Sequence, residues 1–171
     1  MCFFLPFILF FLTAIPVSPL PPLDDFQGPD EVVLDAKRRV QLVARHMEVM
    51  RLHGINTVDV VMGPEKNVLI YPPQNFAHML AELKALPKNA VSNKMLQHIQ
   101  RTHRSIEIDQ NNRILLPSAY VSFGEFDKDL MLAGSGRYLS LWSLPNFLAM
   151  TQGVSAITPA DADQYLPGFS L

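Results

Sequence analysis

Apolar and polar positions follow the same order of patterns twice along the chain, over residues 32–86 and again over residues 106–150. Each half opens with an apolar stretch, a polar turn and an apolar return, which is typical of a β-hairpin. Each then continues with a helical segment, a second hairpin and a helix that begins near a proline. The repetition predicts two copies of one structural unit rather than a single irregular domain.

The first copy shows a clear helical period after its first hairpin. Val43, Met47 and Met50 lie at i, i+4 and i+7, and Gly54 is placed to end the helix. In chain order, the expected elements are a strand at 32–34, a turn at 35–38, a return strand at 39–43, a helix up to Gly54, strands at 57–62 and 68–71 around a turn at 63–67, and a helix at about 76–86.

The second copy follows the same order with a shorter first helix. Pro117 suits the first position of that helix, and Gly124 is placed to close it. The hairpin Asp and the Phe near the start of the last helix are 41 residues apart in the first copy and 38 in the second. The expected elements are a strand at 106–108, a turn at 109–112, a return strand at 113–116, a short helix at 119–123, strands at 130–133 and 138–142 around a turn at 134–136, and a helix from 145.

The two copies and their connections divide the chain into five segments. One copy alone would leave an apolar face uncovered, because a few short strands and a helix cannot enclose a core. We therefore expect an α+β fold in which two tandem repeats, related by a pseudo-twofold axis, join their hairpins into a small barrel-like sheet with flanking helices. The segments are an apolar leader at 1–24, a first repeat at 25–86, a connecting helix at 87–105, a second repeat at 106–150 and a surface tail at 151–171.

The connecting helix is amphipathic and basic. Val91, Met95 and Ile99 fit one helical face. Four cations give the segment its charge: Lys88, Lys94, Arg101 and Arg104.

The leader differs from the rest of the chain, since residues 3–17 are almost wholly apolar and carry no charge. The run is shorter than the roughly 20 residues of a membrane-spanning helix. Its length suits the apolar region of a signal peptide, but no Lys or Arg precedes it. Three interpretations stay open: a signal or anchor, a translation start assigned too far upstream, and a strand of the core.

Composition narrows the class of protein. Apolar residues form 49% of the chain, which favours a packed core over disorder. The net charge of -2 argues against a strongly basic nucleic-acid coat but says nothing of local patches. The single cysteine, Cys2, excludes an internal disulfide and a cysteine metal site.

No combination of residue types points to catalysis or to a metal. His46 and His53 are seven residues apart, His98 and His103 are five apart, and neither spacing matches a helix-borne zinc pair. The glycines at 134–136 fit a hairpin turn rather than a phosphate cradle, because no helix follows them. We therefore expect no enzymatic activity, cofactor, metal or small-molecule substrate.

Both first hairpins carry an Asp and, four residues later, an Arg, in LDAKRRVQL (34–42) and IDQNNRILLP (108–117). In one interpretation the pair braces the turn, with Asp accepting backbone N–H groups and Arg covering the acid. In the other, the Arg presents a cation from a rigid hairpin to a partner. The first turn favours the second interpretation because further cations adjoin its Arg, whereas the second turn has no neighbouring cations.

The chain resembles the MraZ family of bacterial transcription regulators, which carry two tandem AbrB-like swapped-hairpin motifs. The family's hairpin reads leucine, Asp, any residue, Lys, Gly, Arg, then an apolar run ending in Pro. The resemblance covers residues 26–147 and includes the order of elements, and VLIYP (68–72) and LSLW (139–142) resemble the family's strands that end in an aromatic. The matching hairpin residues are Leu34, Asp35, Lys37, Arg39 and Leu42, and then Asp109, Arg113, Leu115, Leu116 and Pro117.

The resemblance implies a cytoplasmic, nucleoid-associated homo-oligomer, shaped as a ring, that binds double-stranded DNA. It further implies short G-rich direct repeats in the promoter of the division and cell-wall gene cluster as the target. Arg39 occupies the position that the family uses for DNA binding. The residues assigned to DNA are Arg39, Lys37, Arg38 and Arg113, and those assigned to turn structure are Asp35, Asp109 and Asn112.

The family's pattern also bears on the leader. Its members usually begin at a Met just before a Phe-x-Gly segment, and FQG stands here at 26–28. The 1–24 segment is extra to that pattern, which favours a start assigned too far upstream over export or anchoring.

The first hairpin departs from the family's pattern at two positions. Arg38 stands where the family has the turn glycine, as Asn112 does in the second copy, and Val43 replaces the closing proline. Glycine would adopt positive φ at little cost, whereas Arg there costs about 1 kcal/mol. We expect the first hairpin to have a different turn or a weaker form of the family's function.

A second function remains open beside the regulator. The leader is compatible with a non-enzymatic interaction module that is exported or anchored in a membrane through residues 3–17. An antitoxin-like dimer fits less well, because the motif is already duplicated within one chain.

Overall fold

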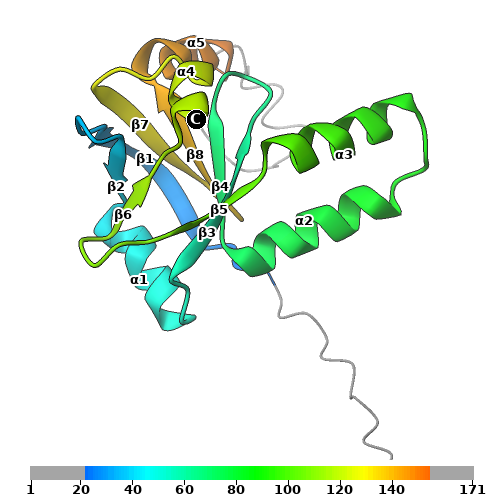
Figure 1. The fold of residues 1–171 in the computed structure, drawn as a ribbon, viewed down its shortest axis with the longest axis horizontal. Helices are drawn as coiled ribbons and strands as arrows, with labels where there is room; N and C mark the ends of the chain where they lie inside the picture. Colours follow the sequence, from blue (N-terminus) through cyan, green and yellow to red (C-terminus); the bar gives the residue numbers. More distant parts are fainter. Residues whose placement is uncertain (1–21, 155–171) are drawn as a thin grey trace, which may run out of the picture.

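A computed structural model describes residues 22–154 of the chain (Figure 1). The segments 1–21 and 155–171 lie outside this part, and with them nearly all of the expected leader and most of the expected tail. The helices are α1 (Ala44–Leu52), α2 (Pro73–Ala85), α3 (Ala90–Thr102), α4 (Ser118–Phe123) and α5 (Leu144–Val154). The strands are β1 (Phe26–Val33), β2 (Arg39–Gln41), β3 (Thr57–Met62), β4 (Val68–Tyr71), β5 (Arg104–Glu107), β6 (Arg113–Leu115), β7 (Asp129–Gly136) and β8 (Leu139–Ser143).

Strands of the two halves are interleaved within one antiparallel sheet of order β1-β7-β8-β4-β3-β5, where the β7–β8 pair of the second half lies between β1 and β4 of the first. β1 of the first half pairs along its whole length with β7 of the second, and β5 of the second half pairs with β3 of the first. β2 and β6 form a separate two-stranded ribbon, again with one strand from each half. The expected α+β fold of two tandem repeats joined as swapped hairpins is therefore confirmed.

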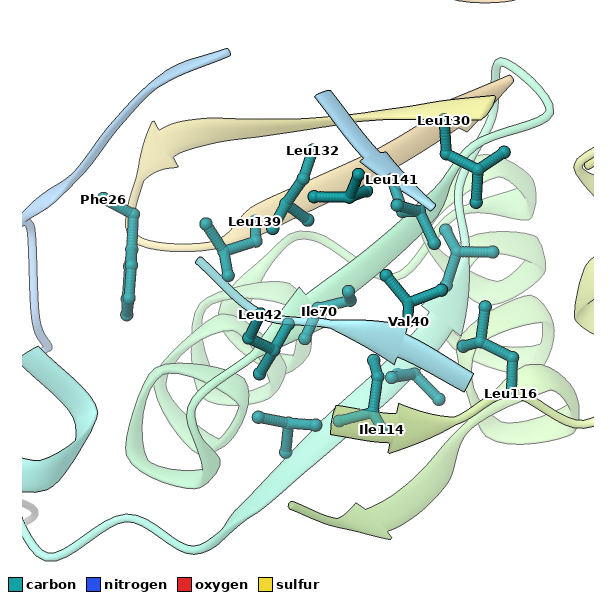
Figure 2. Close-up of a cluster of buried hydrophobic side chains, with 14 of the residues drawn as sticks. Phe26, Val40, Leu42, Ile70, Ile114, Leu116, Leu130, Leu132, Leu139 and Leu141 are labelled. Carbon is teal, nitrogen blue, oxygen red and sulfur yellow. The ribbon is translucent and has the colours of Figure 1, made fainter. Parts of the chain in front are cut away.

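The core lies between the inner face of the sheet and the β2–β6 ribbon (Figure 2). Val40 and Ile114, directly opposite each other in the ribbon, are both fully buried against sheet side chains. Each fully buried aliphatic side chain stabilises the fold by about 1.5–3 kcal/mol. The sheet contributes residues that alternate along its strands, among them Ile70, Leu132, Leu139 and Leu141.

The outer face of the sheet carries a second, smaller apolar cluster of Val61, Tyr71 and Phe76. There burial, together with neighbouring Tyr138, raises the pKa of Tyr71 to about 12. Trp142 is also buried and meets Phe147 of α5 edge-on, with ring centroids 6.4 Å apart. α2 and α3 project from the sheet as an antiparallel helix pair, and α5 packs at the other end (Figure 1).

Local signals explain where the helices begin and end. Pro72 is the N-cap of α2, with Pro73 in its first turn, so that helix begins three residues before the predicted start. Asn89 caps α3 through the N–H groups of Val91 and Ser92, in a capping box that the sequence analysis missed. Gly54, at φ +66°, follows the end of α1 as expected.

Residues just before β1 are held by the body of the protein. Leu23 is buried, and its N–H donates to Asn75 Oδ1 at 2.8 Å while Asn75 Nδ2 donates back to the Leu23 carbonyl at 2.8 Å. Asn75 Nδ2 also donates to the carbonyl of Arg137. The folded body thus includes Leu23, which lies within the segment that the sequence assigned to the leader.

Candidate functional site

The turn of the first hairpin is built around the Asp35 carboxylate. Oδ1 accepts the backbone N–H groups of Lys37 at 2.8 Å and Arg39 at 2.9 Å, and Oδ2 accepts Arg39 Nε at 2.7 Å. The backbone hydrogen bond from Arg39 is the main cause that lowers the pKa of Asp35. The carboxylate is therefore held in its charged form, and it fixes the arginine stem against the turn.

The second turn repeats this geometry around Asp109. Its Oδ1 accepts the N–H groups of Asn111 at 2.8 Å and Arg113 at 2.9 Å, and its Oδ2 accepts Arg113 Nε at 2.8 Å. Arg113 Nη2 also lies 2.7 Å from Asp109 Oδ2, and the side-chain bond from Arg113 is the main cause that lowers the pKa of Asp109. Both aspartates thus have the bracing geometry that the sequence suggested.

The two turns also share one backbone conformation. Arg38 has φ +61° and Asn112 has φ +59°. The expectation that the first hairpin has a different turn is wrong, because the structure imposes the left-handed conformation on Arg38 despite its side chain. The reason is a pair of bonds between the halves: the Arg38 carbonyl accepts Leu116 N–H at 2.9 Å, and the Asn112 carbonyl accepts Leu42 N–H at 2.8 Å.

The ribbon brings the two arginines to one surface. Val40 and Ile114 face the core, so the alternate positions Arg39, Gln41 and Arg113 lie on the outer face. All three line one open hollow of about 490 Å³, beside Asp35. The residues are far apart in sequence, and it is the pairing of β2 with β6 that makes them neighbours.

The two arginines differ in exposure and in how many guanidinium nitrogens are already paired. The Arg39 side chain is 30% exposed and meets its aspartate through Nε, whereas Arg113 is 25% exposed and uses both Nε and Nη2. Within residues 22–154, the Nη groups of Arg39 have no hydrogen-bond or ion-pair partner. Lys37 and Arg38 beside it are exposed. The first turn is the more strongly cationic of the two.

A cation that the sequence analysis did not assign stands at the second turn. Arg51 of α1 donates from Nη2 to Asn112 Oδ1 at 2.8 Å. Residues 36–51 contain five cations against one acid, Glu48, but only the tertiary fold shows that Arg51 contacts the turn of the other half. Arg45, from the same basic stretch, instead pairs with Asp30 and is partly neutralised there.

His46 occupies an unusual position beside that pair. Its side chain is 1% exposed, and its Nε2 lies 3.3 Å from Asp30 Oδ2 without forming a hydrogen bond. Burial is the main cause that lowers the pKa of His46, and the charge of Arg45 acts in the same direction. The burial of His46 was not predicted from the sequence.

His103, from the second histidine pair, contacts an acid and an aromatic ring. His103 Nε2 lies 2.8 Å from Asp59 Oδ1, and its ring stacks on Phe76 with centroids 4.5 Å apart. No cluster of three or more potential metal ligands from His, Cys, Asp and Glu occurs between residues 22 and 154. Nor does any helix in that range have the length and apolarity to cross a bilayer; residues 3–17, on which the anchor hypothesis rests, lie outside it.

Comparison with known proteins identifies the repeat. A family model described as "MraZ protein, putative antitoxin-like" matches twice, over residues 26–99 and 101–165. The protein from Chromobacterium violaceum called transcriptional regulator MraZ is 31% identical over 139 residues, which cover 81% of this chain and 94% of that protein. The regulators of the same name from Saccharophagus degradans and Thiobacillus denitrificans are 32% identical over 123 residues and 28% identical over 147. These matches cover 69% and 85% of this chain, and 82% and 99% of the relatives.

Proposed function

This chain belongs to the MraZ family, and we propose on that premise that it is a transcriptional regulator that binds double-stranded DNA through its two Asp–Arg turns. One observation carries the proposal: Arg39 and Arg113 lie on the outer face of one rigid ribbon and line the same hollow. A regulator that reads DNA needs cations in a fixed geometry, and both arginines are held by aspartates whose own positions are fixed by backbone hydrogen bonds.

Arg39 is the residue that we assign to base recognition. A two-stranded ribbon can enter the major groove, which is about 12 Å wide, and an Arg fork can bond the O6 and N7 atoms of guanine together. Asp35 holds Nε and leaves the Nη edge for that contact. Such an arrangement suits G-rich targets.

The neighbouring cations have a different role in this proposal. Lys37 and Arg38 are exposed at the tip of the turn, where they would contact phosphates and fix the register of the hairpin without reading bases. Arg113 is more fully engaged by its aspartate and makes the weaker contact. Asp35, Asp109 and Asn112 maintain the turns.

One pair of turns offers few contacts, so we propose that affinity comes from a ring-shaped homo-oligomer. Subunits related by rotation would present their turns in the same direction, which fits direct repeats upstream of the division and cell-wall gene cluster. Binding several repeats at once multiplies modest single affinities. The protein would act in the cytoplasm at the nucleoid, without enzymatic activity, cofactor or small-molecule substrate.

The test is binding of the protein to a labelled duplex from upstream of its own gene, measured by fluorescence anisotropy over a salt series. Arg39→Ala should weaken binding by about 1–3 kcal/mol, the value of a bidentate base contact. Arg39→Lys should recover only part of the loss, because it keeps the charge and loses the fork. Lys37→Ala should instead weaken binding to all sequences alike and reduce the salt slope by about 1.

Arg137→Ala is the matched control. Arg137 is another half-exposed arginine paired with a carboxylate, Glu82, but it lies in the β7–β8 turn, away from the hollow. Its replacement should leave DNA binding unchanged. A folded, oligomeric protein that binds the upstream duplex no better than a random one would contradict the proposal.

A further inference from the structure

The outer face of the sheet is only partly covered by helices. α3 packs over β3 at one side and α5 packs over β7 and β8 at the other. Between them run two adjoining hollows of about 490 and 710 Å³, which share Pro64 and Leu69 as wall residues. We call this continuous feature the outer groove. Each hollow lies within the range of about 300–1,000 Å³ seen for ligand pockets.

The outer groove is lined mainly by apolar side chains. At the α3 end its wall includes Met79 and Met95, and at the α5 end it includes Phe147 and Met150. α3 has no buried residue at all, and Met95 is 48% exposed. An amphipathic helix with its apolar face so open normally has something packed against it.

We propose that residues 155–171 of the same chain dock along the outer groove. This segment directly follows α5, and Thr151 near the end of that helix already lines the groove. Its sequence, SAITPADADQYLPGFSL, supplies Tyr165, Leu166 and Phe169 as apolar anchors. Seventeen residues span up to about 56 Å when extended, whereas the distance across β8, β4 and β3 is only about 10 Å, so the reach is ample.

Charge favours residues 155–171 as the occupant of the outer groove, over the leader and over a purely apolar partner. Residues 155–171 contain Asp161 and Asp163 and no Lys or Arg. The groove wall at α3 contains Lys94, which has no ion-pair partner within residues 22–154, whereas the acid of the wall, Glu65, lines the other hollow. The leader has no charge from residue 3 to 17 and so lacks this complementarity.

Docking of this segment is separate from DNA binding. It is tested in the absence of DNA, by limited proteolysis of the full chain with chymotrypsin. Cleavage after Tyr165 and Phe169 is followed by mass spectrometry. Docking predicts that these sites are protected relative to a free peptide of residues 155–171. Met95→Glu places a negative charge in the groove wall and should speed their cleavage about tenfold. Met95 is half-exposed, so its replacement should leave the fold intact.

Gln97→Glu is the matched control, with the same change of charge at an exposed position of α3 that does not line the groove. It should leave cleavage unchanged. Equal cleavage rates in the wild type, in Met95→Glu and in the free peptide would overturn the proposal. Protection that disappears on dilution of the protein would also overturn it, because the groove would then be assigned to a second copy.

Discussion

Asp35 and Asp109 accept the same set of hydrogen bonds, two from backbone N–H groups and one from an arginine Nε. The bracing interpretation and the DNA-binding interpretation of the arginines are therefore compatible. A side chain tied down at Nε loses less conformational freedom when its Nη edge meets a ligand, so bracing prepares the arginine for binding.

Burial of His46 predicts a loss of stability in mild acid. The pKa of His46 is lowered in the folded state from a usual value of 6.5, so the unfolded chain binds this proton more tightly. Stability should therefore fall as pH drops below about 6.5 and level off below the lowered pKa. Urea unfolding between pH 5 and 8 measures this slope.

His46→Gln should flatten that slope, whereas His53→Gln should not, because His53 is exposed at the end of α1. An unchanged slope in His46→Gln would assign the acid sensitivity to other groups. The carboxylates of the two turns act at lower pH, since their stabilisation is lost only as pH falls through their lowered pKa values.

At the level of elements, the two turns are parts of the ribbon rather than loops attached to it. The carbonyls of Arg38 and Asn112 accept N–H groups from the opposite half, just beyond the last paired residues of β2 and β6. The left-handed residue in each turn therefore contributes directly to contact between the halves. Any residue at position 38 must adopt this conformation, whatever its intrinsic preference.

Replacement of Arg38 by glycine should stabilise the protein. Glycine adopts φ near +61° without steric cost, which offsets its larger loss of backbone entropy, and the expected gain is about 0.5–1 kcal/mol. Asn112→Gly should gain less, since Asn already tolerates that region. Chemical denaturation measures both. A loss of stability in Arg38→Gly would mean that the Arg38 side chain stabilises the turn by more than the strain it causes.

The sequence predicted individual elements well because their signals are local. Pro117 and Gly124 bound α4 as expected, and the β-branched run at 57–62 is β3. Pairing partners are not local, which is why the hairpin pattern predicted a strand only at 32–34. β1 runs from Phe26 to Val33, and all eight of its residues pair with β7. The contact of Arg51 with Asn112 and the burial of His46 were missed for the same reason, since both depend on where α1 packs.

For the whole molecule, the interleaving of strands from the two halves makes separate unfolding of one half impossible without breaking the sheet. We predict a single cooperative transition, because β7 and β8 of the second half are paired on both sides with strands of the first. Trp142 fluorescence reports on the second half, and far-ultraviolet circular dichroism reports on all elements. The two curves should coincide in urea. Separate midpoints would show that the halves unfold independently.

The pairing of β1 with β7 also determines when β1 can fold during synthesis on the ribosome. Val33 is 96 residues ahead of its partner Asp129 in the chain. At about 5–20 residues per second, translation needs about 5 to 20 seconds to deliver the second strand after the first. Throughout that interval the nascent first half can close only its local contacts, such as α1 and the β3–β4 hairpin. The time for which β1 stays unpaired is thus set by the rate of translation.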